Sequence, residues 1–245
     1  MRNLYAIFKR ELWSYFHSPI LYIFLVFFLI LNAVFTFKIG GFYEAGQADL
    51  GRFFLWHPWL YLFFIPAVSM RLWSEERKTG TIELLFTLPV GMFEAMSGKF
   101  LAAWVFTSLA ICLTFPMIFT VLYLGQPDIG VIISSYIGSI LLAGSYLAVG
   151  CFFSATTKNQ VISFIITFAT CLGLVLIGFG PFVEFFQSIN LPQSILEQVG
   201  RFSFLTHFMD IMKGILDLRD LLFFILVIAA FLYAGALVLD NRKAT

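Results

Sequence analysis

The chain has 245 residues, of which 60% are apolar, 19% aromatic and only 12% charged, and its formal net charge is +1. A soluble globular domain carries about 25% charged residues, so this composition excludes an ordinary water-soluble domain and indicates a membrane protein. The near-zero net charge and the lack of a basic run argue against nucleic acid as a partner.

The first eighteen residues are too charged for a cleaved signal peptide and repeat apolar side chains at helical spacing. The apolar positions are Leu4, Ile7, Phe8, Leu12, Tyr15 and Phe16. This pattern predicts an amphipathic helix that lies along the cytoplasmic membrane surface. A plain anchor that orients the first span is an equally good interpretation of the periodicity.

Six apolar segments are long enough to cross a bilayer, because roughly 20 helical residues span its hydrocarbon core of about 30 Å. The predicted spans are Pro19–Phe37, Phe53–Met70, Phe100–Leu124, Ile129–Phe153, Val161–Phe186 and Leu221–Leu239. The second span starts near His57, which Trp56 and Trp59 flank, and we expect this histidine at the headgroup level. The fourth carries a small residue at every fourth position from Ser135 to Ala143, which permits close helix packing.

Lys and Arg fall unevenly on the two sides of these spans. Ten of the fifteen lie on the side that holds both termini, and five lie on the other side. Cytoplasmic loops are enriched in Lys and Arg, so both termini are predicted to be cytoplasmic. The sequence thus predicts an all-α, multi-pass membrane protein with six transmembrane helices.

The cytoplasmic loop at residues 71–99 contains helix-ending residues whose positions predict two short helices. Gly80 ends an extension of the second span, because glycine tolerates a left-handed helix-ending conformation. A new helix of about two turns runs from Ile82 to Leu88, where Pro89 disfavours helical geometry. Its apolar side chains lie on two sides, so one membrane surface does not cover them all. Two interpretations stay open: a turn tucked beneath its own bundle, or a docking element.

Residues 187–220 are too apolar for an ordinary loop between the last two spans. Charged residues are interspersed among the apolar ones, which predicts short re-entrant helices that dip into the outer leaflet or lie on it. Glu184 precedes this segment at the outer end of the fifth span, and we interpret it as a solvated helix terminus.

Patterns for nucleotide binding or catalysis are missing from the sequence. Gly98-Lys99 is followed by Phe100 instead of Ser or Thr, so the chain has no phosphate-binding P-loop. The sequence also lacks the metalloprotease and serine-hydrolase motifs, and its three histidines are scattered. We therefore expect no catalytic, cofactor-binding or metal-ligating residues in this chain, and we do not expect an enzyme.

The loop sequence and two further stretches resemble a known family. From Glu75 to Val90 the chain reads EERKTGTIELLFTLPV, and Gly98-Lys99-Phe100 follows. This pattern resembles the signature of ABC-2-type transporter permeases, and the resemblance covers nearly the whole chain. Residues 9–20 and 207–220 are similar to the branch of that superfamily that includes gliding-motility-associated permease subunits.

The resemblance implies that residues 1–245 form a single ABC-2-type transmembrane domain. It would be the permease subunit of an ABC exporter in the bacterial cytoplasmic (inner) membrane, surrounded by lipid and paired with a second copy or a paralogue. Separate ABC ATP-binding subunits would hold ATP and Mg, and their ATP hydrolysis would move the substrate across the membrane.

The resemblance also favours the docking interpretation of the loop. In the family, the helix that matches residues 81–88 is a coupling helix that binds in a groove of the ATPase. The amphipathic N-terminal helix (residues 1–18) lies at the same interface, and short re-entrant helices separate the last two spans. The residues expected at the ATPase-coupling interface are Glu75, Glu76, Arg77, Lys78, Thr81, Ile82, Glu83, Leu85 and Phe86.

Two other classes of protein would use the same spans. An ATP-independent channel or carrier needs a polar stripe along a pore, for which only four serines of the fourth span qualify. They are Ser134, Ser135, Ser139 and Ser145. A membrane scaffold of a motility-type complex would dock an ATPase without transporting a substrate.

Overall fold

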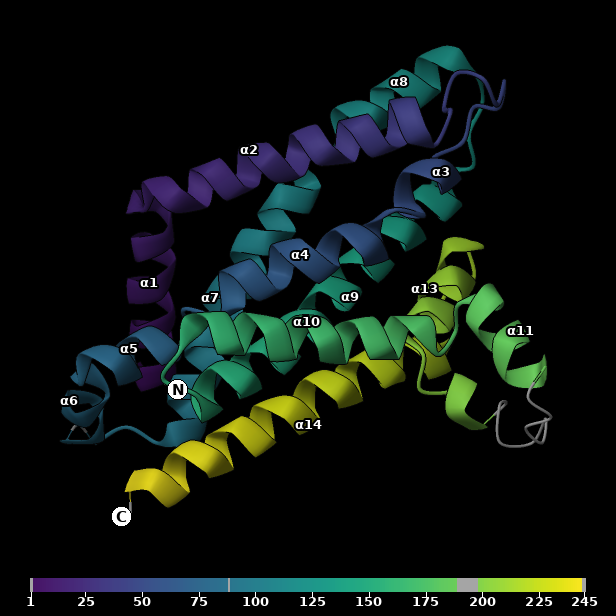
Figure 1. Ribbon diagram of the computed structural model, residues 1–245. Helices are drawn as coiled ribbons and strands as arrows, with labels where there is room; N and C mark the ends of the chain where they lie inside the picture. Colours follow the sequence, from purple (N-terminus) through teal and green to yellow (C-terminus); the bar gives the residue numbers. More distant parts are fainter. Residues whose placement is uncertain (1, 88, 189–197, 244–245) are drawn as a thin grey trace.

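The computed structural model describes residues 2–87, 89–188 and 198–243, and in these residues all regular secondary structure is helical (Figure 1). The helices are α1 (Arg2–His17), α2 (Pro19–Val34), the π-helical turn η1 (Phe35–Ile39), α3 (Gly51–Phe54), α4 (His57–Ser69), α5 (Ser74–Thr79), α6 (Thr81–Thr87), α7 (Met92–Cys112), α8 (Pro116–Leu124), α9 (Ile129–Thr156), α10 (Gln160–Leu176), α11 (Gly180–Ser188), α13 (Phe204–Met212) and α14 (Leu218–Lys243).

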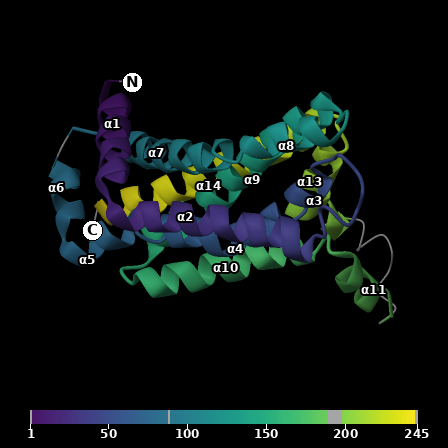
Figure 2. The same ribbon diagram turned by 90° about the horizontal axis from the view of Figure 1, so that it is seen from above.

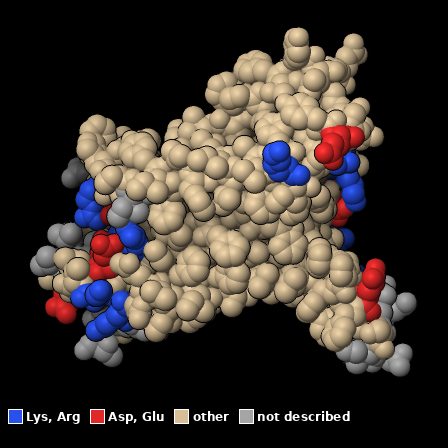
Figure 3. All heavy atoms as spheres, turned by 45° about the horizontal axis from the view of Figure 1, so that its top comes forward, with Lys and Arg blue, Asp and Glu red and all other residues tan. Residues whose placement is uncertain are grey.

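Five helical stretches of the described chain are long and apolar enough to cross a membrane, and a bent pair of helices makes up a sixth candidate. The five are Leu21–Ile39, Gly51–Thr79, Met92–Leu124, Ile129–Thr156 and Leu218–Asn241. Charged side chains gather toward the two ends of the face seen in Figure 3, with an uncharged belt between them. The structure confirms the prediction of an all-α polytopic membrane protein.

The fifth predicted span is not one straight helix. α10 and α11 meet at an angle of 75°. Gly178 lies at this bend, where an added Cβ would overlap the hydroxyl of Ser203 at the start of α13. The missing side chain therefore lets α13 approach the bend.

α9 is the central helix of the bundle, and it packs against α4, α7, α10, α13 and α14 (Figures 1 and 2). The small residues Ser135, Ser139 and Ala143 are all buried on it. Short side chains allow neighbouring helices to approach closely, so this stripe serves helix packing, as predicted.

α1 lies crosswise to the spans, at the end of the bundle that holds both termini (Figures 1 and 2). It packs against α7, where Gly98 leaves room: an added Cβ would lie 3.0 Å from Ile7 Cγ2. Ile7 is buried in this contact, whereas Tyr5 and Trp13 stay exposed. Part of the apolar face predicted to cover the membrane surface is therefore used to attach α1 to its own bundle.

His57, the first residue of α4, lies in the interior of the subunit, and its depth in the membrane stays a prediction. Its ring is 0% exposed. The ring Nε2 lies 3.1 Å from the Asn32 amide nitrogen on α2, and Nδ1 lies 2.8 Å from Ser139 Oγ on α9. Polar partners from two other helices satisfy the ring, which is why it is accommodated away from water.

The segment between the last two spans contains short helices, as predicted, although residues 189–197 lie outside the described part of the chain. α13 begins at Ser203, whose hydroxyl accepts hydrogen bonds from the backbone N–H groups of Leu205 and Thr206. Phe204 and Phe208 are fully buried, and the helix packs against α9, α10 and α14. One face of α13 is therefore buried against the bundle, while Thr206 on another face stays exposed.

Candidate functional site

α5 and α6 form a helical hairpin at the end of the bundle that holds both termini (Figure 1). The turn is at Gly80, whose φ of +77° lies in the left-handed region, as the sequence predicts. The Thr79 hydroxyl donates a 3.0 Å hydrogen bond to the Glu75 carbonyl and closes the last turn of α5. α6 ends at Thr87, two residues before Pro89.

Four of the predicted interface residues are exposed on this hairpin. They are Glu75, Lys78, Thr81 and Glu83. Ile82 instead turns inward and joins the buried apolar cluster of the subunit. The side chains of Leu84, Leu85 and Phe86, and residue Leu88, lie outside the described part of the chain.

The root of the hairpin contains a buried lysine between two carboxylates. Lys99 on α7 is 3% exposed, and its Nζ lies 2.7 Å from Glu76 Oε1 on α5 and 3.2 Å from Glu11 Oε1 on α1. Arg10 lies 2.7 Å from the same Glu11 oxygen. The Lys99 ammonium also lies 5.1 Å from the centre of the Trp73 ring, within range of a cation–π interaction. We name Arg10, Glu11, Glu76 and Lys99 the root cluster.

The root cluster is neutral overall, with two cations and two anions. Burial raises the pKa of the Glu11 carboxyl, but the Lys99 ammonium and the Arg10 guanidinium outweigh it and hold the pKa below its ordinary value of 4.5. Removing one partner of such a buried pair commonly costs about 3–5 kcal/mol, because an uncompensated charge stays behind. The cluster therefore joins α1, α5 and α7 strongly.

A second set of contacts attaches α5 to the end of α9. The Ser154 hydroxyl accepts hydrogen bonds from the backbone N–H groups of Trp73, at 3.0 Å, and Ser74, at 3.1 Å. Arg77 Nη1 donates a 2.8 Å hydrogen bond to the Ala155 carbonyl. The root of the hairpin is thus bonded to the central helix as well.

The predicted interface residues therefore fall into two groups, one at the root of the hairpin and one toward its free end. Glu76 and Arg77 bond within the subunit at the root, while most of the other described members lie toward the free end of the hairpin. Sequence reasoning missed Glu11, Lys99 and Ser154 as members of the same site. The Gly98-Lys99 pair was the one signal for Lys99, but its two carboxylate partners are 88 and 23 residues away in the chain.

The four serines that were considered for a pore are buried inside the subunit. Ser134 and Ser135 both donate hydrogen bonds to the Val131 carbonyl, at 2.9 and 2.7 Å. Ser139 meets His57, and Ser145 donates to the Phe224 carbonyl at 3.4 Å. They serve helix packing in this subunit instead of forming a polar stripe along a channel.

The described residues contain no group of three or more His, Cys, Asp or Glu side chains that could hold a metal ion. The site consists instead of an exposed helical hairpin and a charged root that joins three other helices. This arrangement is suited to binding a partner and to transmitting its movement.

A family model for the ABC-2 family transporter protein matches residues 50–239. The match runs from the start of α3 into α14, so it includes the hairpin and all the spans except the first. No curated protein matches the chain. Because the match covers most of the 245 residues, the chain belongs to the ABC-2 family, as a multi-pass permease subunit that works with ABC ATP-binding subunits.

Proposed function

We propose that this protein is the permease subunit of an ABC exporter and that ATP-binding subunits dock on the α5–α6 hairpin and on α1. The observation that carries the proposal is the hairpin itself, which is exposed at its free end and bonded at its root to three other helices. The exposed Glu75, Lys78, Thr81 and Glu83 are the polar contacts to the ATPase. Leu85 and Phe86 are the proposed apolar anchors, and their side chains lie outside the described residues.

The root contacts would convert movement of the hairpin into movement of the spans. Closure of the ATPase dimer would displace α6, and the root cluster would pass this displacement to α1 and α7. The bonds of Ser154 and Arg77 would pass it to α9. α5 also continues from α4 in the second membrane-spanning stretch, Gly51–Thr79, which would tilt against a partner subunit. The substrate path would then open between two permease subunits.

The proposal also includes the partner subunits and the membrane in which the protein lies. A second copy or a paralogue completes the transporter, and separate ATPase subunits supply the ATP and Mg site. The excess of Lys and Arg on the side of the termini supports both termini in the cytoplasm. The location in a bacterial inner membrane rests on the resemblance to ABC-2-type permeases. Similarity of residues 9–20 and 207–220 supports a place in the gliding-motility-associated branch.

Co-purification tests the docking site. The chain is isolated from its native membrane in mild detergent, and the retained proteins and ATPase activity are measured. We expect Leu85→Asp to insert normally but to lose the ATPase, because a carboxylate would be buried without a partner in the ATPase groove. Tyr43→Asp is the matched control, because it adds the same charge at an exposed aromatic residue outside the hairpin and its root.

The outcomes separate the proposal from its rivals. Retention of the ATPase by Leu85→Asp would refute the docking assignment. A preparation without any nucleotide-binding subunit, together with substrate flux in ATP-free liposomes, would favour a channel or carrier. An ATPase that docks on the hairpin while no substrate moves would favour a membrane scaffold.

A further inference from the structure

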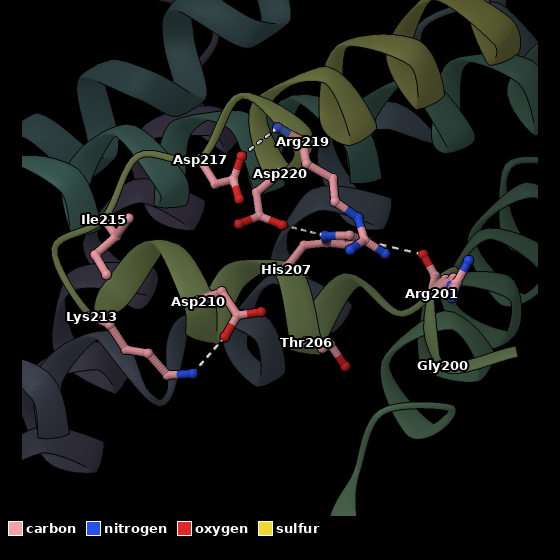
Figure 4. A pocket seen from close by; sticks show the side chains of 10 residues that line it. All are labelled: Gly200, Arg201, Thr206, His207, Asp210, Lys213, Ile215, Asp217, Arg219 and Asp220. Atoms are coloured by element: carbon pink, nitrogen blue, oxygen red, sulfur yellow. Dashed lines mark hydrogen bonds and ion pairs between the residues drawn. The ribbon is translucent and has the colours of Figure 1, made fainter. Parts of the chain in front are cut away.

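Two neighbouring cavities lie at the end of the bundle opposite to the termini, around α13 and the start of α14 (Figure 4). The first has a volume of about 610 Å³ and is lined mainly by polar residues. The second, of about 730 Å³, is lined mainly by apolar residues, including Leu222 and Leu226. Arg201, His207 and Arg219 line both cavities, so a polar space and an apolar space meet at these three residues.

Most charges of the polar cavity are compensated within the subunit. Lys213 Nζ lies 2.5 Å from Asp210 Oδ1, and His207 Nδ1 lies 2.6 Å from Asp220 Oδ1. His207 Nε2 donates its proton to the Arg201 carbonyl, at 2.9 Å. Lys213 and Asp210 thus cancel each other's charge, and the Asp220 carboxylate is occupied by the His207 ring.

Two guanidinium groups take no part in these pairs. Arg201 and Arg219 are both exposed, and among the described residues neither side chain makes an ion pair. Figure 4 shows the Arg219 side chain pointing from the start of α14 toward His207 and Arg201. The remaining carboxylate is that of Asp217, whose Oδ1 accepts the Arg219 backbone N–H at 3.0 Å. The lining Lys and Arg residues equal the Asp residues in number, three of each, so what the cavity offers an anion is the unpaired donors of these two guanidinium groups.

Guanidinium groups are suited to phosphate. Their planar set of N–H donors matches two phosphate oxygens at once, and the resulting hydrogen bonds are strengthened by charge. A shared anion also relieves the repulsion between two neighbouring cations. A phosphate between Arg201 and Arg219 would satisfy both groups.

The apolar cavity extends from these arginines along a candidate span. Leu222 is 44% exposed and Leu226 is 64% exposed, one and two turns into α14. At about 1.5 Å per residue, Leu226 lies roughly 10 Å from Arg219 along the helix axis. Phe202 lines the same cavity and is 65% exposed. The apolar cavity thus has the direction and the lining that an acyl chain needs.

We propose that these joined cavities bind a phosphate-bearing membrane lipid of the leaflet opposite to the termini, with its phosphate on Arg201 and Arg219 and its acyl chain along Leu222 and Leu226. The adjoining polar and apolar spaces argue for a lipid over a free phosphate ion. The site does not involve the α5–α6 hairpin, so it is testable without an ATPase.

Native mass spectrometry of the purified full chain, titrated with phosphatidylglycerol in mild detergent, tests the proposal. We expect each of Arg201→Gln and Arg219→Gln to weaken lipid binding about tenfold, because each removes a charge-assisted contact. Arg201→Lys keeps the charge but loses the two-pronged geometry, so we expect a smaller loss. Lys38→Gln is the matched control: it removes an exposed cation outside both cavities and should leave binding unchanged.

Three results would overturn the proposal. The first is that the arginine variants bind phosphatidylglycerol as tightly as the unmodified protein does and unfold at the same temperature. Diacylglycerol, which has the same chains without the phosphate, would bind equally well. Soluble glycerol phosphate would displace the lipid at similar concentration, which would assign the site to a free phosphate instead.

Discussion

The two ends of the bundle use their charges differently. At the end with the termini, the root cluster surrounds Lys99, which is 3% exposed, with carboxylates from two other helices. At the opposite end, His207 and Asp220 form one buried pair, but Arg201 and Arg219 remain exposed beside it. The buried cation at the first end is paired within the subunit, whereas two arginines at the second end make no ion pair among the described residues and are available to an outside anion.

This difference shows how similar residues serve two purposes. Charges that are buried and paired hold helices in one arrangement, because separating them strands an ion away from water. Charges that are exposed contribute little to folding and are available for recognition. Substitutions in the root cluster should therefore mainly lower stability, whereas substitutions of Arg201 and Arg219 should mainly weaken binding.

The largest effect on stability is expected at the root cluster. Lys99→Met removes the cation shared by Glu11 and Glu76 and should lower the free energy of unfolding by about 3 kcal/mol. Denaturant titration in mixed micelles measures it, and Lys78→Met, an exposed lysine of the same hairpin, is the control that should change little. Adding Glu11→Gln and Glu76→Gln should restore part of the loss. A Lys99 variant as stable as the control would contradict the proposed role of the cluster.

A smaller effect is expected from the buried pair at the opposite end. Asp220→Asn keeps the shape of the side chain but removes the charge next to His207, which should cost about 2 kcal/mol of unfolding free energy. The same titration measures it, with Asp217→Asn as the exposed control. Equal stability of the two variants would mean that the His207–Asp220 contact does not hold α13 to α14.

The smallest effect is a pH dependence at the root cluster. The pKa of Glu11 lies below 4.5 in the folded protein, mainly because Lys99 and Arg10 favour its charged form against the effect of burial. Its contribution to stability is complete above pH 4.5 and is lost as the pH falls through the lower folded-state pKa. Melting temperatures measured below pH 4.5 should therefore fall less steeply for Glu11→Gln than for the unmodified protein. Parallel curves would show that Glu11 is not stabilised in this way.

The membrane spans and the hairpin were predictable because their causes are local. A run of apolar residues matches the thickness of the hydrocarbon core wherever it occurs in a chain. Gly80 and Pro89 bound α6 through their own backbone preferences. The exact course of the spans was less predictable: α10 and α11 meet at 75°, and α13 approaches closely at Gly178 beside the bend.

The candidate site was predicted in part. The loop motif indicated the hairpin, but it did not distinguish Glu76 and Arg77, which bond at the root, from Glu75 and Lys78, which face solvent. These four residues are adjacent in sequence and alike in chemistry. Their roles differ because of what lies opposite each of them in the folded subunit.

By itself, the sequence determined that this protein is a helical membrane protein, where its spans lie approximately, and that a short helical hairpin interrupts them. Only the tertiary structure decided which charges meet, that His57 is buried, and that α1 packs on α7. The physical reason is range: backbone preference and hydrophobicity act within a few residues, whereas Glu11 and Lys99 are 88 residues apart and pair only after the helices pack.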